Sequence, residues 1–106
     1  MPKYLIQGNY TADSLNGLLK EGGSSRRAAV EALLASVGGK VEASYFAFGK
    51  TDIFVIVEVP DNVTAAALSL FVNAAGAVAI KVTPLLTAEE IDAAAKMSVS
   101  YRAPGQ

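Results

Sequence analysis

The side chains that could do chemistry in this chain are few, because it contains neither histidine nor cysteine. Disulfides, thiolate metal sites, histidine-ligated haem and catalytic triads built on imidazole are therefore excluded. Proton transfer would have to rest on tyrosine, aspartate, glutamate, lysine or the N-terminus. The acids Glu89, Glu90 and Asp92 lie together where a helix is expected to begin, and there they favour the helix dipole without any ion. We expect no metal site and no cofactor.

Glycines, hydroxyls and two arginines follow one another in the segment 22–27. At the start of a helix, free backbone N–H groups and the guanidinium of Arg26 would suit a phosphate or a carboxylate. The spacing differs from that of a P-loop, which needs Gly-Lys-Ser/Thr. The structural alternative is a break between two helices, with Arg27 pairing Glu31 one turn along. Both interpretations remain open at this point.

Two carboxylates flank the most apolar segment of the chain. Asp52 and Glu58 are six residues apart, which in an extended strand is roughly 20 Å and too far for paired catalytic carboxylates. Glu58 alone, between apolar neighbours, could be a functional carboxylate, or Lys81 could neutralise it. The tyrosines carry a similar ambiguity, because most tyrosines in a small domain are packing residues.

Length and composition limit the class of protein. The chain has 106 residues, of which 52% are hydrophobic and 18% charged, so one well-packed domain is expected and disorder is excluded. A net charge of −1 gives no electrostatic footprint for nucleic acid, and no apolar run is long enough to cross a membrane. The N-terminus lacks a signal-peptide pattern, so the cytoplasm is the expected location. We expect one domain over residues 1–97 and a tail over 98–106.

The elements that must position these groups follow from hydrophobic periodicity and turn residues. Strands are expected at 3–7, 41–48, 53–59 and 78–83. Thr11 is the expected N-cap of the first helix, which should end at Gly22 and Gly23. Ser24 or Ser25 is the expected N-cap of a second helix. A third helix is expected after Pro60, Asp61 and Asn62, with the apolar stripe Val63, Ala66, Ala67, Leu70, Phe71 and Ala74. The capping box from Thr87 to Glu90 predicts a last short helix.

This order, β-α-β-β-α-β with a split first crossover and a final helix, predicts a ferredoxin-like α+β sandwich. Four antiparallel strands would form the sheet, with the helices on one face. The handedness of the crossovers places the first and third strands in the middle.

Alternation along the strands separates two faces of the sheet. An apolar set is expected to meet the helices: Tyr4, Ile6, Val41, Ala43, Tyr45, Ile53, Val55, Val57, Val59, Val78, Ile80 and Val82. The opposite set is mixed: Leu5, Gln7, Glu42, Ser44, Phe46, Phe48, Phe54, Ile56, Glu58, Ala79, Lys81 and Thr83. Exposed aromatic area of this kind marks an interface or a groove. A homo-oligomer is therefore expected, as a dimer through this sheet face or as a trimer.

The mixed face also supplies the predicted ligand site. Pockets are mostly apolar with a few convergent polar groups, and this set has that composition. The predicted ligand-binding residues are Gln7, Asn9, Tyr10, Arg26, Phe46, Phe48, Asp52, Phe54 and Glu58. A rival location lies between the sheet and the helices, near Tyr4, Tyr10 and Tyr45.

Several short motifs, in this order and spacing, resemble the GYD-domain family over residues 3–91. They are Gly22 to Arg26, Tyr45 to Gly49 before Asp52, Glu58 to Asn62, Gly76 to Val78 and Leu86 to Glu90. In the signature segment Gly49 and Asp52 match, and Thr51 stands where the family has tyrosine. The resemblance implies a ferredoxin-like fold related to the dimeric α/β-barrel proteins of bacteria, and it implies no reaction because the family is uncharacterised.

Three functions from different classes fit these observations. The first is a small oligomeric module that binds a mostly apolar or acidic organic ligand. The second is a cofactor-independent monooxygenase or isomerase, in which tyrosine, Asn9 and Glu58 would supply the polar groups. The third is a tautomerase with Pro2 as its N-terminal base, although Pro2 would equally suit the start of an edge strand.

Overall fold

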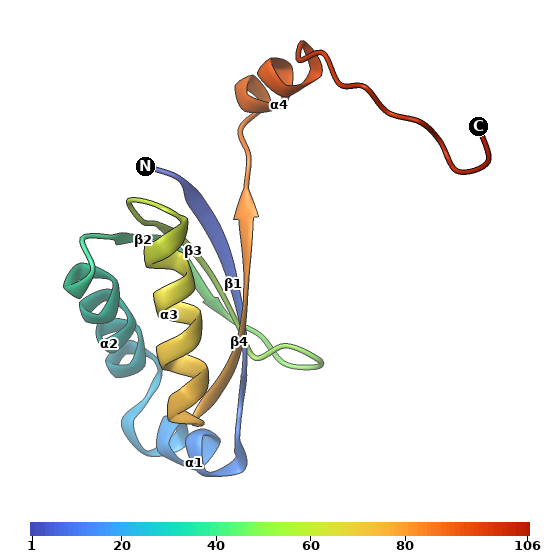
Figure 1. The fold of residues 1–106 in the computed structure, drawn as a ribbon. Helices are drawn as coiled ribbons and strands as arrows, with labels where there is room; N and C mark the ends of the chain where they lie inside the picture. The colour runs from blue at the N-terminus through green and yellow to red at the C-terminus, as the bar shows by residue number, and fades with distance from the viewer.

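Four strands form one antiparallel sheet in the order β2-β3-β1-β4, so the first and third strands are central, as predicted. The computed structural model describes residues 1–106 (Figure 1). The strands are β1 Lys3–Tyr10, β2 Lys40–Phe46, β3 Ile53–Glu58 and β4 Val78–Leu85. The helices are α1 Ala12–Glu21, α2 Gly23–Ser36, α3 Asn62–Ala75 and α4 Ala88–Ala95. The chain is thus an α+β protein with a ferredoxin-like arrangement, and its first crossover contains two helices.

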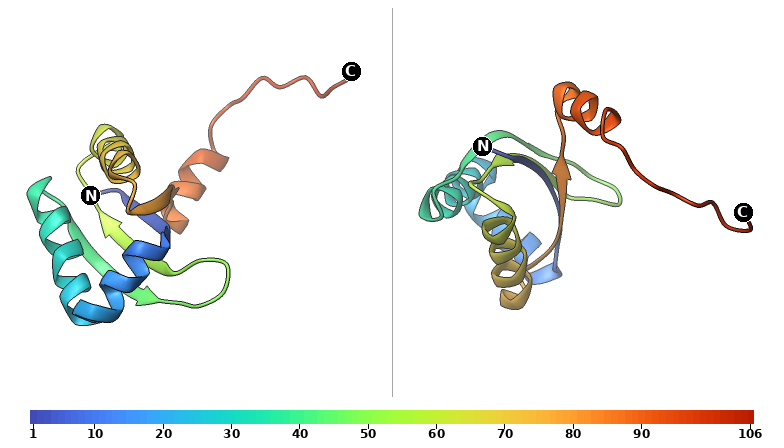
Figure 2. Two further views of the ribbon diagram at one scale, coloured as in Figure 1. Left: turned by 90° about the horizontal axis from the view of Figure 1, so that it is seen from below. Right: turned by 45° about the horizontal axis from the view of Figure 1, so that its top comes forward.

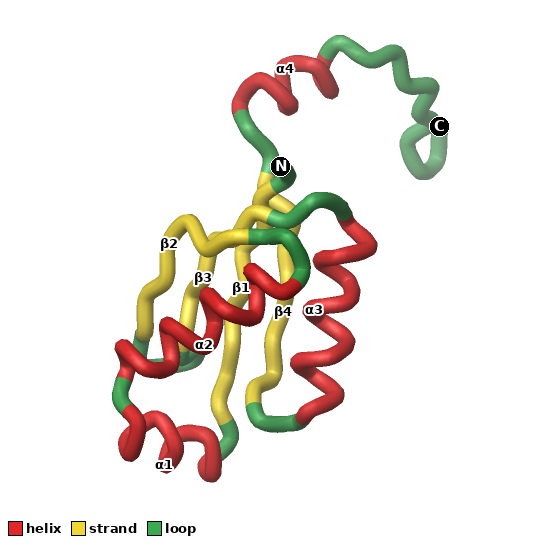
Figure 3. The backbone as a smooth tube through the Cα atoms, turned by 90° about the vertical axis from the view of Figure 1, so that its left-hand side faces the viewer, coloured by secondary structure: helices red, strands yellow, loops and turns green.

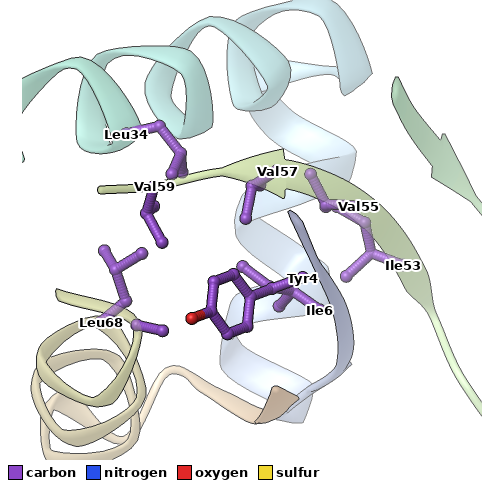
Figure 4. Close-up of a cluster of buried hydrophobic side chains, with 9 residues drawn as sticks. Tyr4, Ile6, Leu34, Ile53, Val55, Val57, Val59 and Leu68 are labelled. Atoms are coloured by element: carbon purple, nitrogen blue, oxygen red, sulfur yellow. The ribbon is translucent and has the colours of Figure 1, made fainter. Parts of the chain in front are cut away.

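Helices α2 and α3 lie on one face of the sheet, and the opposite face carries no helix (Figures 2 and 3). The core fills the layer between the sheet and these two helices (Figure 4). Its largest fully buried side chains are Leu34 from α2, Val57 from β3, and Val59 just after β3. Because the alternate residues of β1 and β3 point into this layer, the predicted apolar face of the central strands is confirmed.

Side-chain caps fix the starts of three helices at the predicted residues. Thr11, Asp61 and Thr87 each accept a hydrogen bond from a backbone N–H in the first turn, and Thr87 completes the capping box with Glu90. The backbone N–H and the hydroxyl of Thr64 both donate to Asp61 and hold the pKa of its carboxyl below the usual range. The predicted serine cap of α2 is wrong. Gly22 occupies the N-cap position without a side-chain bond, at φ 87°, a conformation that glycine adopts without strain.

Strand β1 runs on to Tyr10, although it was predicted to end at Gln7. A glycine is required at position 8 because side chains of the neighbouring strands pack closely against its backbone. A Cβ built on it would lie 2.8 Å from Cγ2 of Ile53 and 3.1 Å from Cγ1 of Val78. Strand β4 likewise continues past its predicted end at Thr83 and includes Pro84, because an edge strand tolerates a residue without an N–H.

A bulge in β2 changes which side chains face the helices. The register shifts between Val41 and Ala43, so that Ala43 stands opposite Ile56 and Tyr45 opposite Phe54. A one-residue slip moves every following side chain to the other face. The prediction that Tyr45 faces the helices and Phe46 the open side is therefore wrong. The ring of Phe46 instead lies 3.2 Å from the position of a Cβ on Gly23, at the start of α2.

Helix α3 turns its predicted apolar stripe away from the sheet. The side chains that it buries are Ala65 and Leu68, while Val63, Leu70 and Phe71 are exposed. The helical period did not identify the buried side of α3, because this helix contains no charged residue and is apolar on nearly every side.

The close approach at Gly8 can be tested against a second glycine. Gly8→Ala should lower the free energy of unfolding by about 1–3 kcal/mol, because its methyl group overpacks the contact with Ile53. The control Gly17→Ala, inside α1 and with no atom within 4 Å of its Cβ, should raise it by about 0.5–1 kcal/mol. Urea denaturation followed by circular dichroism measures both values. Equal stability of the two variants would contradict the packing described here.

Candidate functional site

An apolar cavity of about 70 Å³ lies between the sheet and the two helices that cover it. Ten of its lining residues are aliphatic: Ile6, Val30, Leu33, Leu34, Ile53, Val55, Leu68, Val72, Val78 and Ile80. The two others, Tyr10 and Arg26, are the only ones with a polar group in the side chain. A mostly apolar hollow with a few convergent polar groups has the composition of a small-molecule site.

The local sequence explains why an arginine reaches this cavity. Gly22 ends α1 and starts α2, so Arg26 falls in the first turn of α2, where its N–H donates to the carbonyl of Gly22 at 3.2 Å. Val30 follows four residues later and Leu33 and Leu34 one further turn along, and this spacing places all four on one face of the helix. The face that packs on the sheet therefore begins with a guanidinium and continues as aliphatic side chains.

Arg26 is half-buried and belongs to none of the three ion pairs of the structure. Its neighbour Arg27 does have a partner, because its Nε lies 3.8 Å from Oε1 of Glu31. The two alternatives for the Gly-Ser-Arg segment thus divide between the two arginines. Arg27 forms the predicted pair along the helix, and Arg26 presents an unpaired cation beside an apolar space.

Tyr10 separates the cavity from two neighbouring hollows. One, of about 180 Å³, also shares Arg26 with the cavity and is lined by Ser14 and Glu21 among others. The other, of about 170 Å³, lies between Tyr10, Phe46 and Asp52 and the residues of α1. No hydrogen bond engages the Tyr10 phenol. Tyr10 and Arg26 are therefore two polar groups without partners at the mouth of one apolar space.

Asp52 holds the end of β1. Its carboxylate accepts a hydrogen bond of 2.8 Å from the backbone N–H of Tyr10, and its own N–H donates to the carbonyl of Gly8 at 2.9 Å. These two bonds tie the turn after β2 to the strand that carries Tyr10. The contacts of Asp52 are thus those of a residue that positions Tyr10.

The open sheet face carries Leu5, Phe54 and Ile56 on its central strands and Tyr45 on β2, all at least partly exposed. Charged side chains gather at the end of the sheet where Glu58 lies, and Lys40 approaches Glu58 to 3.4 Å. The hydrogen bond to Glu42 raises the pKa of the Lys3 ammonium, as do the charges of Glu42 and Glu58. Lys40 rather than Lys81 is thus the partner of Glu58. Lys81 stands opposite Gln7, farther along the sheet.

The structure divides the predicted ligand-binding residues among separate places. Tyr10 and Arg26 line the apolar cavity, and Tyr10, Phe46 and Asp52 line the hollow beside it. Gln7 and Asn9 border a shallow hollow on the open face, whereas Phe54 and Glu58 lie on that face next to β1 and β2. Phe48 is fully exposed in the turn after β2. No single space collects these nine residues.

The rival location between sheet and helices holds the cavity, although with one of its three predicted tyrosines. Tyr10 lines it, Tyr4 is buried in the core with its phenol donating to Asn62, and Tyr45 lies on the opposite face. The lining residues that come from the strands, Ile6, Ile53, Val55, Val78 and Ile80, were predicted only to meet the helices. The sequence does contain a signal for a polar group at this cavity, since Arg26 precedes Val30 by one turn on a helix face that is otherwise apolar.

Other predicted groups lie away from this cavity. Pro2 is exposed just before β1, where its carbonyl accepts a hydrogen bond of 3.2 Å from the backbone N–H of Val59. Among the described residues no group of three or more acidic side chains could hold a metal ion. No helix has both the length and the apolar character needed to cross a membrane.

Comparison with known proteins adds one finding. Neither the curated proteins nor the solved structures contain a sequence that matches this chain. The family model of the GYD domain matches residues 4–95, which include the sheet from the second residue of β1 onward and every residue that lines the cavity. The chain belongs to the GYD-domain family.

Proposed function

We propose that the chain binds a small apolar carboxylate in the cavity between the sheet and helices α2 and α3. The observation that carries this proposal is the unpaired guanidinium of Arg26 at the edge of an otherwise aliphatic space. A guanidinium offers two parallel N–H donors that match the two oxygens of a carboxylate. An aliphatic tail on the same ligand would fill the cavity and exclude water from this ion pair.

The dimensions of the cavity select the ligand's tail. A rigid apolar cavity of about 150 Å³ accommodates benzene, and this one measures about 70 Å³. A short or branched aliphatic chain therefore suits it better than an aromatic ring. The free phenol of Tyr10 would donate a further hydrogen bond to the carboxylate or to a neighbouring oxygen.

Binding is favoured over catalysis by the composition of the lining. A cofactor-independent oxygenase or isomerase needs a group that takes a proton from its substrate. Tyr10 is the only residue of the lining with an exchangeable phenol, and the carboxylates Asp52 and Glu58 are engaged with Tyr10 and Lys40. The polar groups at the cavity suit recognition of an anion.

We further propose that the chain is a homodimer whose open sheet faces pack together. Leu5, Phe54 and Ile56 occupy the middle of a face that no helix covers. Full burial of each such side chain contributes about 1.5–3 kcal/mol. A two-fold axis through this face would bring the same three residues of two copies together, with the ion pairs of Lys3 and Lys40 at the rim.

The ligand proposal predicts a charge-dependent thermal shift. Isovalerate at millimolar concentration should raise the melting temperature by several degrees, and its neutral amide should not, because only the carboxylate engages Arg26. Arg26→Met should abolish the shift. The matched control Arg27→Met should keep it, since Arg27 pairs with Glu31 on the same helix. Equal shifts with acid and amide, or a shift that survives in Arg26→Met, would refute the proposal.

Removal of Arg26 should cost little stability. Because this guanidinium has no partner in the protein, Arg26→Met should change the free energy of unfolding by less than about 0.5 kcal/mol. Leu34→Ala, in the same lining but fully buried, should lower it by about 2–5 kcal/mol. Chemical denaturation compares the two. A loss above about 1.5 kcal/mol in Arg26→Met would show that the arginine is structural.

The dimer is testable by light scattering. The wild-type chain should have twice the monomer mass at micromolar concentration, and Phe54→Glu should halve it by placing a charge in the buried sheet face. Leu19→Glu, which alters an exposed side chain of α1 away from that face, should stay dimeric. A wild-type monomer at these concentrations would disprove the dimer.

A further inference from the structure

The last part of the chain stands away from the rest of the molecule. Residues 86–106, here the C-terminal arm, follow β4 and contain α4 (Figure 1). Every residue from Leu86 to Arg102 is exposed. The radius of gyration is 17.0 Å, whereas a compact chain of this length has about 13 Å. The arm thus has no packing surface within its own chain.

The arm has the composition of a segment that packs. It carries five exposed large apolar residues: Leu86, Ile91, Met97, Val99 and Tyr101. Its helix has eight residues, and isolated helices shorter than about 12–15 residues are marginal in water. The capping box of Thr87 fixes where the helix starts, but tertiary contacts must supply most of its stability.

The outer surface of α3 is an apolar surface without a partner. Val63, Leu70 and Phe71 are 79, 69 and 77% exposed. The fourteen residues of α3 include no charged side chain, which is unusual for a helix in contact with water. The surface lies on the helical side of the sheet, so a sheet-to-sheet dimer would leave it uncovered.

We infer that the arm of one copy packs on the outer surface of α3 in a second copy. This inference rests on the proposed dimer, because the two-fold axis lets each copy give one arm and receive one. Figures 1 and 2 show that the arm leaves on the side of the sheet away from its own helices. It therefore heads toward the partner and away from its own α3.

The length of the arm is sufficient for this contact. Packed sheets lie about 10 Å apart, a helix layer lies about another 10 Å beyond, and the outer surface of a helix lies about 5 Å farther, so the arm must cross roughly 25 Å. Residues 86 and 87 and the eight residues of α4 together span about 19 Å, and the six residues 96–101, when extended, reach about 20 Å more. The segment 96–101, with Met97, Val99 and Tyr101, can thus lie along the partner's α3.

Limited trypsin digestion of the full chain tests this inference. Lys96 and Arg102 are cleavage sites in the arm, and the exposed Lys20 in the last turn of α1, away from the open sheet face, serves as an internal reference. Cleavage after Lys96 should slow at least tenfold, relative to cleavage after Lys20, as the protein concentration rises from the monomer range into the dimer range. Phe71→Glu should restore fast cleavage, while Leu19→Glu, at a position that is at least as exposed but lies on α1, should not.

Cross-linking identifies the partner chain, since the natural sequence has no cysteine to interfere. A Leu70→Cys chain mixed with a Val99→Cys chain should form a disulfide-linked heterodimer. The control Lys20→Cys, mixed with Val99→Cys, should form much less. If the chain that carries both Leu70→Cys and Val99→Cys closes an internal disulfide at low concentration, the arm packs on its own α3 and the inference fails.

The outcomes also separate this inference from the dimer itself. A chain that is dimeric by light scattering but is cut after Lys96 as fast as the same chain diluted to the monomer range overturns the arm exchange and leaves the sheet-face dimer intact. A chain that stays monomeric at every concentration removes both. Slow cleavage after Lys96 that is independent of concentration also overturns the exchange, because it places the arm on its own chain.

Discussion

The antiparallel pairing of β1 with β3 is the constraint on which the rest of the structure depends. It sets Ile6 opposite Val55 and Gly8 opposite Ile53 at the centre of the sheet. This register turns Tyr4, Ile6 and the alternate residues of β3 toward the helices, and it leaves Leu5 and its neighbours on a face that two helices cannot reach. The cavity behind the sheet and the bare face in front of it are two results of one pairing.

The sequence predicted the parts of the fold that depend on local rules. The split crossover and three helix caps follow from periodicity and capping residues, which act within short segments, and the strand order follows from the general handedness of crossovers. The errors arose where packing between segments decides. Apolar residues alternate along β2 without interruption across the bulge, so the sequence pattern does not reveal that Tyr45 and Phe46 exchange faces. Helix α3 is apolar nearly all round, so its periodicity does not tell which side the sheet contacts.

The candidate site shows the same limit. Arg26 and Tyr10 were predicted as ligand-binding residues on chemical grounds, and the structure brings them to one cavity. Their predicted companions came from the alternation of the opposite face and lie elsewhere. The aliphatic lining has no sequence signal of its own, because a residue that lines a cavity and one that fills a core are chosen for the same burial. Only the unpaired charge of Arg26 beside these residues distinguishes a cavity lining from a filled core. Its neighbour Arg27, which pairs with Glu31, shows the difference between a paired and an unpaired arginine on one helix.

Nuclear magnetic resonance of the arginine side chains tests most directly whether a carboxylate binds at Arg26, because it reports on Arg26 and Arg27 in one titration. With isovalerate, the Nε–H signal of Arg26 should shift and saturate together with the methyl signals of Val30 and Leu34, while that of Arg27 stays in place. This result would locate the carboxylate at the guanidinium and the aliphatic tail in the cavity. Shifts confined to Phe54 and Ile56 on the open sheet face, or equal shifts of both arginines, would contradict the account.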